Sequence, residues 1–485
     1  MSYEISSNVD KNYTNEDTSS FHIFPVNNFD VLARAFSSSF QFNINLYNIF
    51  GEVYSMYLDT TSRIGAPSEH HWKNLSEVDK TLIAKSGQIF DARLREDQFL
   101  RNLSDTLTSS SELIKIMGLG KLYQYFSNMF STWNNNYVEP IRDIFYRTPS
   151  QKICELEKYS LFRYNKLSSD SEKKNVQIHR IDNEEKNMPS PVLVIYAFIN
   201  RHYILDLLPE ISVVRNLLNQ GLDIFATDWG TPSVYDRTLT VGHFVNKYID
   251  SSVDIIRRIT KSDKVCLLGY CWGGDLALMY SALHPEKVKN LITIATPGDF
   301  ALDNSLLSIW TRSINEKRIL DTFGNVPGSL LNSAFNLRRP REYSHKYFHF
   351  FEQPRSIESI TEFFATETWL YDSPPVIGEI YREFVEYCYK QNLLIKNKMS
   401  IESQNNNDGE VVVNLKNITM PFLNIVAKHD DLVEPDSSKA LNYVLTESRD
   451  KDLFEFKSGH VGLMIGKKAH QELWPKVANW IKNHS

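Results

Sequence analysis

Residues 264–282, KVCLLGYCWGGDLALMYSA, decide the fold because they are typical of a strand, a tight turn and a helix in immediate succession. The strand is the apolar run 265–268, and the helix begins at Trp272 with apolar residues recurring along one face. Between them, GYCWG is a nucleophile-elbow pattern, G-x-C-x-G, with cysteine in the serine position. The helix N-terminus behind such an elbow favours a thiolate. We therefore predict that Cys271 is a nucleophile.

A cysteine beside glycine can also be a small buried hydrophobe. We expect this of Cys266, which lies inside the apolar strand. Cys271 differs because strand, elbow and helix follow one another in the order that the motif requires.

The bulk composition limits the classes of protein to which this chain can belong. Its 485 residues, 42% of them hydrophobic, suffice for two or three globular domains. A net charge of −6 without a basic stripe argues against nucleic-acid binding. The four cysteines show neither disulfide nor zinc-ligand spacing, which predicts a reducing cytoplasm and no metal. We also expect no export signal and no transmembrane segment, because the N-terminus is polar and no apolar run is long enough.

The order of patterns predicts three regions. Residues 1–20 are polar and acidic, which predicts a disordered tail. Helical periodicity predicts a mostly α-helical N-terminal domain over residues 21–145. Residues 146–485 are predicted to form the catalytic domain, with a cap at about 300–400, where prolines break short helices.

Within the predicted catalytic domain, apolar strands alternate with helices. This alternation is typical of a mostly parallel sheet with helices on both faces, so the fold class is α/β and the elbow makes it an α/β-hydrolase fold. We place the first strand at residues 192–197. The further predicted strands are residues 222–227, 265–268, 291–295, 422–427 and 453–456.

A thiol nucleophile needs a base and an acid, and in α/β-hydrolases these follow the nucleophile in the order acid, then histidine. Asp430 follows one predicted strand, and His460 follows the next between two glycines. We predict Asp430 as the acid and His460 as the base. Asp431 remains an alternative acid because it shares the loop of Asp430.

An oxyanion hole in this fold uses the backbone N–H of the residue after the nucleophile and one N–H from the loop after the first strand. The first donor is Trp272. For the second we select Phe198 from the loop 197–200, although side-chain identity says little about a backbone donor.

Seven blocks of sequence resemble the polyhydroxyalkanoate synthase family, and most closely the catalytic subunit of its class III enzymes. In chain order they are VIYAFINRHYILDL, SVVRNLLNQGLDIFATDWG, LGYCWGGDLALMYSALHPEKVKNLITIATPGDF, FGNVPGSLLNSAFNLRRP, TWLYDSP, LKNITMPFLNIVAKHDDLVEP and SGHVG. A single G-x-C-x-G would be a weak signal, whereas seven ordered blocks are a strong one.

The resemblance implies a Cys/His/Asp acyltransferase that polymerises (R)-3-hydroxyacyl-CoA thioesters, such as the precursor of poly(3-hydroxybutyrate), with release of CoA. By motif, Cys271 would hold the growing chain as a thioester, His460 would activate it, and Asp430 would orient His460 or assist the attacking hydroxyl. A thiolate exchanges one thioester for another at little cost in free energy, which suits a cysteine nucleophile. CoA thioester is then the substrate, and no cofactor is implied.

The same resemblance implies a cytoplasmic protein that associates with polyester granules, and a homodimer that contacts its partner through the cap. The N-terminal 145 residues resemble the helical accessory subunit that class III enzymes recruit as a separate chain. We therefore expect the chain to contact the growing polyester and the granule surface. A separate accessory subunit is a further possible partner, unless the N-terminal region replaces it.

Three residues depart from the pattern of the family. Trp272 stands where glutamine is usual, His202 where proline is usual, and Asp431 where family members commonly have histidine. None of the three removes the predicted triad. They change the residues that meet substrate at the mouth of the site and the surroundings of Asp430.

Two alternative functions remain open on the sequence. The first is a cysteine esterase or polyester depolymerase on the same fold. In such an enzyme water accepts the acyl chain from the cysteine, whereas in a polymerase a hydroxyacyl group accepts it. A non-enzymatic, granule-associated scaffold would have no need for Cys271, Asp430 and His460 together.

Overall fold

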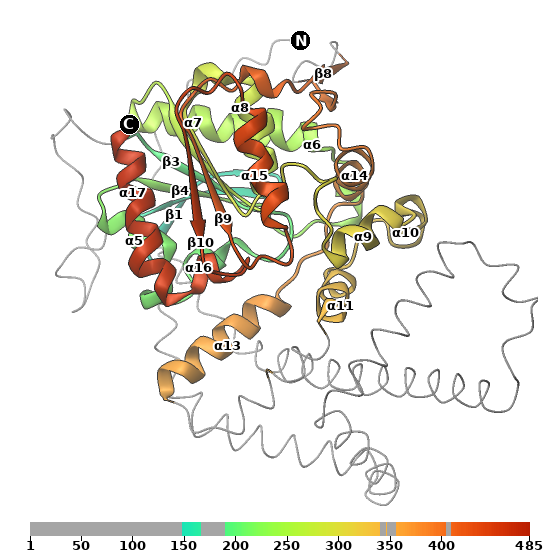
Figure 1. The fold of residues 1–485 in the computed structure, drawn as a ribbon, viewed down its shortest axis with the longest axis horizontal. Coiled ribbons are helices and arrows are strands. Elements are labelled where there is room, and N and C mark those ends of the chain that lie inside the picture. Colours follow the sequence, from blue (N-terminus) through green and yellow to red (C-terminus); the bar gives the residue numbers. More distant parts are fainter. Residues whose placement is uncertain (1–147, 166–189, 340–345, 347–355, 404–408) are drawn as a thin grey trace, which may run out of the picture. The chain divides into compact units, whose positions relative to one another are not determined.

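A computed structural model describes residues 148–165, 190–339, 346, 356–403 and 409–485 (Figure 1). The predicted tail at 1–20 and the whole of the predicted helical domain at 21–145 lie outside these residues. Those two predictions, with the domain boundaries, stay predictions.

The described residues are built around an eight-stranded sheet with the strand order β1-β2-β4-β3-β5-β6-β9-β10. The six strands from β4 to β10 pair in parallel, whereas β2 pairs antiparallel with both β1 and β4. The mostly parallel sheet predicted from the sequence is confirmed. The strands are β1 (Ser150–Leu156), β2 (Tyr159–Tyr164), β3 (Val192–Ile195), β4 (Ile224–Asp228), β5 (Val265–Tyr270), β6 (Val288–Ile294), β9 (Phe422–Ala427) and β10 (Lys451–Phe456).

The prediction that the sheet begins at residue 192 is wrong, because β1 and β2 precede it as an antiparallel hairpin. β1 is an edge strand, and most of its side chains are exposed or half-buried. A strand with so little burial lacks the clear apolar alternation by which strands are found in a sequence.

Helices cover the sheet, and Figure 1 shows α5 and α17 lying together on one side of it. Helix α8 packs against β5, β6 and β3 and is buried from Trp272 to Ala282. The core helices are α5 (Val213–Asn219), α6 (Val241–His243), η6 (Phe244–Ile249), α7 (Asp250–Thr260), α8 (Trp272–Leu283), α15 (Pro435–Val444), α16 (Gly462–Ile465), η10 (Ala469–Leu473) and α17 (Trp474–Asn483).

The segment between β6 and β9, which we call the cap, is mostly helical where the structure describes it. Figure 1 shows α9, α10 and α11 gathered beyond the sheet on the side away from α17. Its elements are α9 (Leu306–Ser313), α10 (Glu316–Phe323), α11 (Gly328–Arg338), α13 (Ile357–Tyr371), α14 (Gly378–Glu383), η8 (Phe384–Lys390) and the two-stranded sheet of β7 (Ser400–Glu402) and β8 (Glu410–Val412). Among the described residues, no helix combines the length and the apolar character that crossing a bilayer requires.

Candidate active site

The elbow between β5 and α8 holds Cys271 in a backbone conformation that is rare outside glycine. Its φ is 55° and its ψ is −128°. The Cys271 N–H donates to the Ile294 carbonyl at 2.9 Å, and the Cys271 carbonyl accepts from the Gly274 N–H at 2.8 Å. Both bonds fasten the strained residue to its neighbours, and backbone strain of this kind is concentrated at functional sites.

The three predicted triad residues follow the carboxyl ends of parallel strands. Cys271 follows β5, Asp430 lies just after β9, and His460 lies just after β10. Because parallel strands end at the same edge of a sheet, residues from three distant parts of the chain meet there. The His460 Nδ1 atom lies 2.7 Å from Asp430 Oδ2.

The Asp430 side chain is held in place from its other side. Its Oδ1 atom accepts hydrogen bonds from the N–H groups of Leu432, at 2.9 Å, and Val433, at 3.0 Å. The Asp430 side chain is 1% exposed and the His460 side chain 6%. A buried carboxylate with this set of donors fixes the orientation of the imidazole that it contacts.

The surroundings of His460 favour its protonated form. Burial opposes the imidazolium charge, but the carboxylate of Asp430 and the charge and hydrogen bonding of the Cys271 side chain outweigh it and raise the pKa of His460. The Tyr270 hydroxyl also donates to the His460 carbonyl at 3.4 Å. The structure therefore brings Cys271, His460 and Asp430 together in an arrangement that can move a proton between sulfur and nitrogen.

Asp431, the alternative acid, has different partners. Its Oδ2 atom lies 2.8 Å from Arg338 Nη1 and 2.6 Å from Arg339 Nε. Both arginines come from the end of α11 and the residue that follows it. Asp431 thus ties the cap to the loop that carries Asp430, while Asp430 itself contacts His460.

Trp272 begins α8, so its backbone N–H lies in the first turn of the helix, next to Cys271. Its indole stacks on Phe384 with ring centroids 4.3 Å apart, and its Nε1–H donates to the Tyr389 hydroxyl at 3.3 Å. Both partners belong to η8 of the cap. The departure from the usual glutamine therefore creates an aromatic contact between elbow and cap.

Phe198 lies on the loop after β3, and β3 pairs directly with β5. Its ring is buried and meets Phe244 edge-on at 5.0 Å and Trp229 at 5.5 Å. The side chain is therefore part of the core. The roles of the Phe198 and Trp272 N–H groups as oxyanion donors stay predictions.

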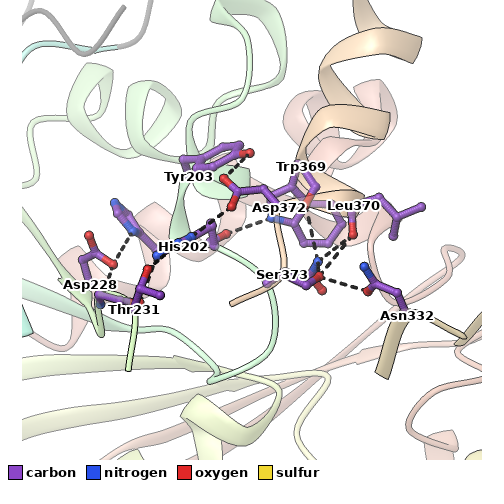
Figure 2. Close-up of polar contacts among 12 residues, drawn as sticks. His202, Tyr203, Asp228, Thr231, Asn332, Trp369, Leu370, Asp372 and Ser373 are labelled. Atoms are coloured by element: carbon purple, nitrogen blue, oxygen red, sulfur yellow. Dashed lines mark hydrogen bonds and ion pairs between the residues drawn. The ribbon is translucent and has the colours of Figure 1, made fainter. Parts of the chain in front are cut away.

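Sequence reasoning missed a polar cluster that joins the loop after β3 to the end of α13. Figure 2 shows two of its hydrogen bonds, one from Tyr203 to Asp372 and one from Ser373 to Asn332. The blocks VIYAFINRHYILDL and TWLYDSP contain most of its residues, so their presence in the same family pattern was an available signal. Nothing in the sequence indicated that these two blocks contact each other in space.

His202, the second departure from the family pattern, lies beside Asp228 at the end of β4. The His202 Nδ1 atom is 3.6 Å from Asp228 Oδ1 (Figure 2). Burial opposes the Asp228 carboxylate charge, but His202 and the Gly230 N–H outweigh it and lower the pKa of Asp228. A cavity of about 20 Å³, enough for about one water molecule, is lined by His202, Asp228 and Phe198.

One group among the described residues could ligate a metal ion, namely Asp450, Asp452 and His484, whose ligand atoms lie within 4.8 Å of one another. Asp450 and Asp452 flank the beginning of β10, at the opposite end of that strand from His460. Asp452 already accepts a hydrogen bond from the Trp480 indole, at 2.7 Å. This group is not part of the candidate active site.

Comparison with known proteins places the chain in a class and then in a family. Residues 190–467 match the family model described as alpha/beta hydrolase fold, so the chain is an α/β-hydrolase-fold protein. Relatives named poly(3-hydroxyalkanoate) polymerase subunit PhaC are 37% identical over 335 residues in Allochromatium vinosum and 38% identical over 342 residues in Haloarcula marismortui. These matches cover 69% and 70% of this chain, and 88% and 68% of the relatives. The chain belongs to the poly(3-hydroxyalkanoate) polymerase subunit PhaC family.

A relative of the same name from Synechocystis is 35% identical over 341 residues, with 69% of this chain and 84% of the relative covered. The family resemblance expected from the seven sequence blocks is confirmed. Its narrower part, closeness to class III, stays a prediction.

Proposed function

We propose that this protein polymerises (R)-3-hydroxyacyl-CoA into a polyester with release of CoA, through an acyl intermediate on Cys271. The single observation that carries the proposal is the buried His460–Asp430 pair, 2.7 Å apart and coupled to the elbow cysteine, in a chain of the poly(3-hydroxyalkanoate) polymerase family.

The first half of the cycle loads the enzyme. The Cys271 thiolate attacks the thioester carbonyl, and the charge that develops on the carbonyl oxygen is stabilised by N–H donors at the start of α8 and on the loop after β3. The carbon–sulfur bond to CoA breaks, and the His460 imidazolium donates its proton to the departing CoA thiolate. The products are CoA and a thioester on Cys271.

The second half extends the chain. The neutral His460 accepts a proton from the hydroxyl of an incoming hydroxyacyl group, whose oxygen attacks the thioester on Cys271. An ester bond forms, the carbon–sulfur bond to Cys271 breaks, and the proton on His460 restores the ion pair with sulfur. The extended chain is now a thioester of the incoming CoA, and attack by the Cys271 thiolate, as in the first half, returns it to sulfur and releases that CoA. Asp430 keeps the imidazole oriented through both halves.

The cap serves to keep water out while the acyl group is on sulfur, because hydrolysis of that thioester would end the chain. The Trp272 indole and the pairing of Asp431 with Arg338 and Arg339 hold the cap to both sides of the site. We place the protein in the cytoplasm at the polyester granule, working as a homodimer.

The N-terminal region takes the place of the separate accessory subunit in this proposal. Purified full-length chain that polymerises by itself would support the idea. Strict dependence of activity on a second chain would contradict it.

Substitution of Cys271 tests the mechanism. We expect Cys271→Ala to abolish CoA release from 3-hydroxybutyryl-CoA, a loss of at least about 1000-fold, because no acyl acceptor remains. Cys154→Ala is the matched control, since Cys154 lies half-buried on the edge strand β1. Polymer formation by Cys271→Ala would refute the assignment.

The products distinguish a polymerase from a hydrolase with the same triad. Released CoA accompanied by insoluble polyester is the expected result. Released CoA accompanied by soluble 3-hydroxy acid in equal amount would make the protein a thioesterase instead.

A further inference from the structure

The end of α13 is docked on the loop that leaves β3. The Trp369 indole N–H donates to the Arg201 carbonyl at 2.8 Å, and the Tyr203 hydroxyl donates to Asp372 at 3.1 Å (Figure 2). Arg201 Nε donates to the same carboxylate at 3.2 Å. Hydrogen bonds therefore run in both directions across this contact.

Asn200 lies at the centre of the contact. Its side-chain amide donates to the Ser373 hydroxyl at 2.7 Å and to the carbonyls of Leu370, at 3.0 Å, and Trp369, at 3.4 Å. All three acceptors belong to the last turn of α13 or the residues after it. Asn200 is 9% exposed, so water cannot readily replace these acceptors.

The backbone of Asn200 is also unusual. Its φ is 61°, in the left-handed region that asparagine tolerates better than most residues. The conformation turns the chain sharply two residues after Phe198. Asn200 therefore sets the direction of the loop that carries the predicted oxyanion donor. The same residue is the one that hydrogen-bonds to the end of α13.

The opposite side of the loop is attached to the sheet. Arg201 Nη1 donates to the Gly230 carbonyl at 2.9 Å, and Arg201 Nη2 donates to the Thr231 hydroxyl at 2.7 Å. Both acceptors follow β4. The loop after β3 thus lies between the rigid sheet on one side and the cap on the other.

We propose that Asn200 is a positioning residue that holds the loop after β3 in its catalytic geometry only while α13 is docked. This inference rests on the proposed function, because it takes the Phe198 N–H as an oxyanion donor. The last turn of α13 then acts as a support of the oxyanion hole, and undocking of the cap lowers the rate of acyl transfer.

The same cap helices reach the acid side of the site. The Ser373 hydroxyl, which accepts from Asn200, donates to Asn332 on α11 at 2.9 Å. The far end of α11 carries Arg338, which pairs with Asp431. Docking of α11 and α13 therefore supports the loops on both sides of Cys271.

Two substitutions of Asn200 separate hydrogen bonding from packing. Asn200→Ala removes the donor and also strains the backbone at a φ of 61°, whereas Asn200→Asp tolerates that φ and keeps the shape but places oxygen against carbonyl oxygens. We expect both to lower kcat for acyl transfer about 10- to 100-fold, the cost of a misplaced oxyanion donor, with KM nearly unchanged. The matched control is Asn246→Ala, a buried asparagine that donates to the Glu402 carbonyl at 2.6 Å, away from this loop.

The decisive readout compares two reactions of the same sulfur. Alkylation of Cys271 by iodoacetamide needs the thiolate but no oxyanion hole, so its rate should be unchanged or faster in both variants. Acylation by 3-hydroxybutyryl-CoA and by 4-nitrophenyl acetate needs the hole and should be slower. Equal loss in alkylation and acylation, or unchanged acylation in both folded variants, would overturn the role of Asn200.

The two acyl donors also separate this inference from the proposed function. A wild-type chain acylated by the nitrophenyl ester but not by the CoA thioester would contradict the polymerase and still allow the Asn200 variants to be judged. A wild-type chain acylated by neither would overturn both.

Discussion

Trp272 contributes its backbone and its side chain to different parts of the protein. The backbone N–H stands next to Cys271 at the start of α8, while the indole lies flat against Phe384 and donates to Tyr389. Aromatic stacking adds about 0.5–1.5 kcal/mol beyond the burial of area alone. The residue therefore links the η8 segment of the cap to the elbow that carries the nucleophile.

Two substitutions of Trp272 should lower the unfolding free energy by different amounts. Trp272→Phe keeps the stacked ring and loses the hydrogen bond, so we expect a loss of about 1 kcal/mol in unfolding free energy. Trp272→Ala also loses the packing and should cost about 3–5 kcal/mol. Urea unfolding of the full-length variants measures both, and equal midpoints for the two variants would show that the indole does not pack on η8.

At the scale of elements, the unit of strand β5, elbow and helix α8 depends on close approach of backbones. A Cβ atom on Gly273 would lie 2.2 Å from the Ile195 carbonyl oxygen and 2.7 Å from the carbonyl carbon of Tyr196. Neither atom is at the end of a flexible side chain. Helix α8 can therefore start against β3 only if residue 273 has no side chain.

Gly273→Ala should force α8 away from β3. We expect a loss of about 3 kcal/mol in unfolding free energy, because overpacking against backbone cannot be relieved by a rotamer change. Gly459→Ala is the control, on the loop that carries His460. A Cβ atom on residue 459 would have the His429 carbonyl oxygen as its nearest neighbour, at 3.6 Å. If urea midpoints fall equally in both variants, the tight contact at Gly273 is not what stabilises the elbow.

At the scale of the whole molecule, the cap is joined to the core by buried polar contacts. Glu383, the last residue of α14, accepts a hydrogen bond from the Val241 N–H at the start of α6, at 2.6 Å. Burial raises the pKa of Glu383 to about 7, although the Val241 N–H opposes the shift. The joint between α14 and α6 is therefore sensitive to pH near neutrality.

The sign of the pH effect follows from the raised pKa. The folded state holds the Glu383 proton more tightly than the unfolded chain, whose ordinary glutamate pKa is about 4.5. Protonated Glu383 therefore contributes its full stabilisation of the folded state below about pH 4.5. This contribution is lost as the pH rises through about 7. Glu383→Gln keeps an acceptor oxygen and should stabilise the protein at pH 8 by about 2–3 kcal/mol, with no gain at pH 4.5.

Urea midpoints measured between pH 4.5 and 8 test this prediction. Glu472→Gln is the control, because Glu472 is an exposed carboxylate of η10 that pairs with Lys468 at 3.7 Å and does not act on the pKa of Glu383. A stabilisation of Glu383→Gln that is the same at every pH would contradict a titrating carboxyl group at residue 383.

Predictions from sequence succeeded where the signal was local. The strand predicted at 265–268, the elbow and the start of α8 at Trp272 are encoded by neighbouring residues, and the structure has all three, with β5 running two residues further to 270. Strand β1 was missed because an edge strand needs little apolar alternation. That reason does not extend to β2, which lies between β1 and β4 and is mostly buried. The sequence favoured Asp430 as the acid but left Asp431 open, since adjacent residues differ only in where the folded loop points their side chains.

What the sequence alone determined is the class of fold, the elbow and the order of nucleophile, acid and histidine, because each follows from periodicity and short motifs. Tertiary structure decided which carboxylate meets His460 and which cap residues hold the oxyanion loop. Asn200 and its acceptors Trp369, Leu370 and Ser373 are 169 to 173 residues apart. Contacts over such separations depend on how the sheet and cap pack, and no local pattern of residues encodes that packing.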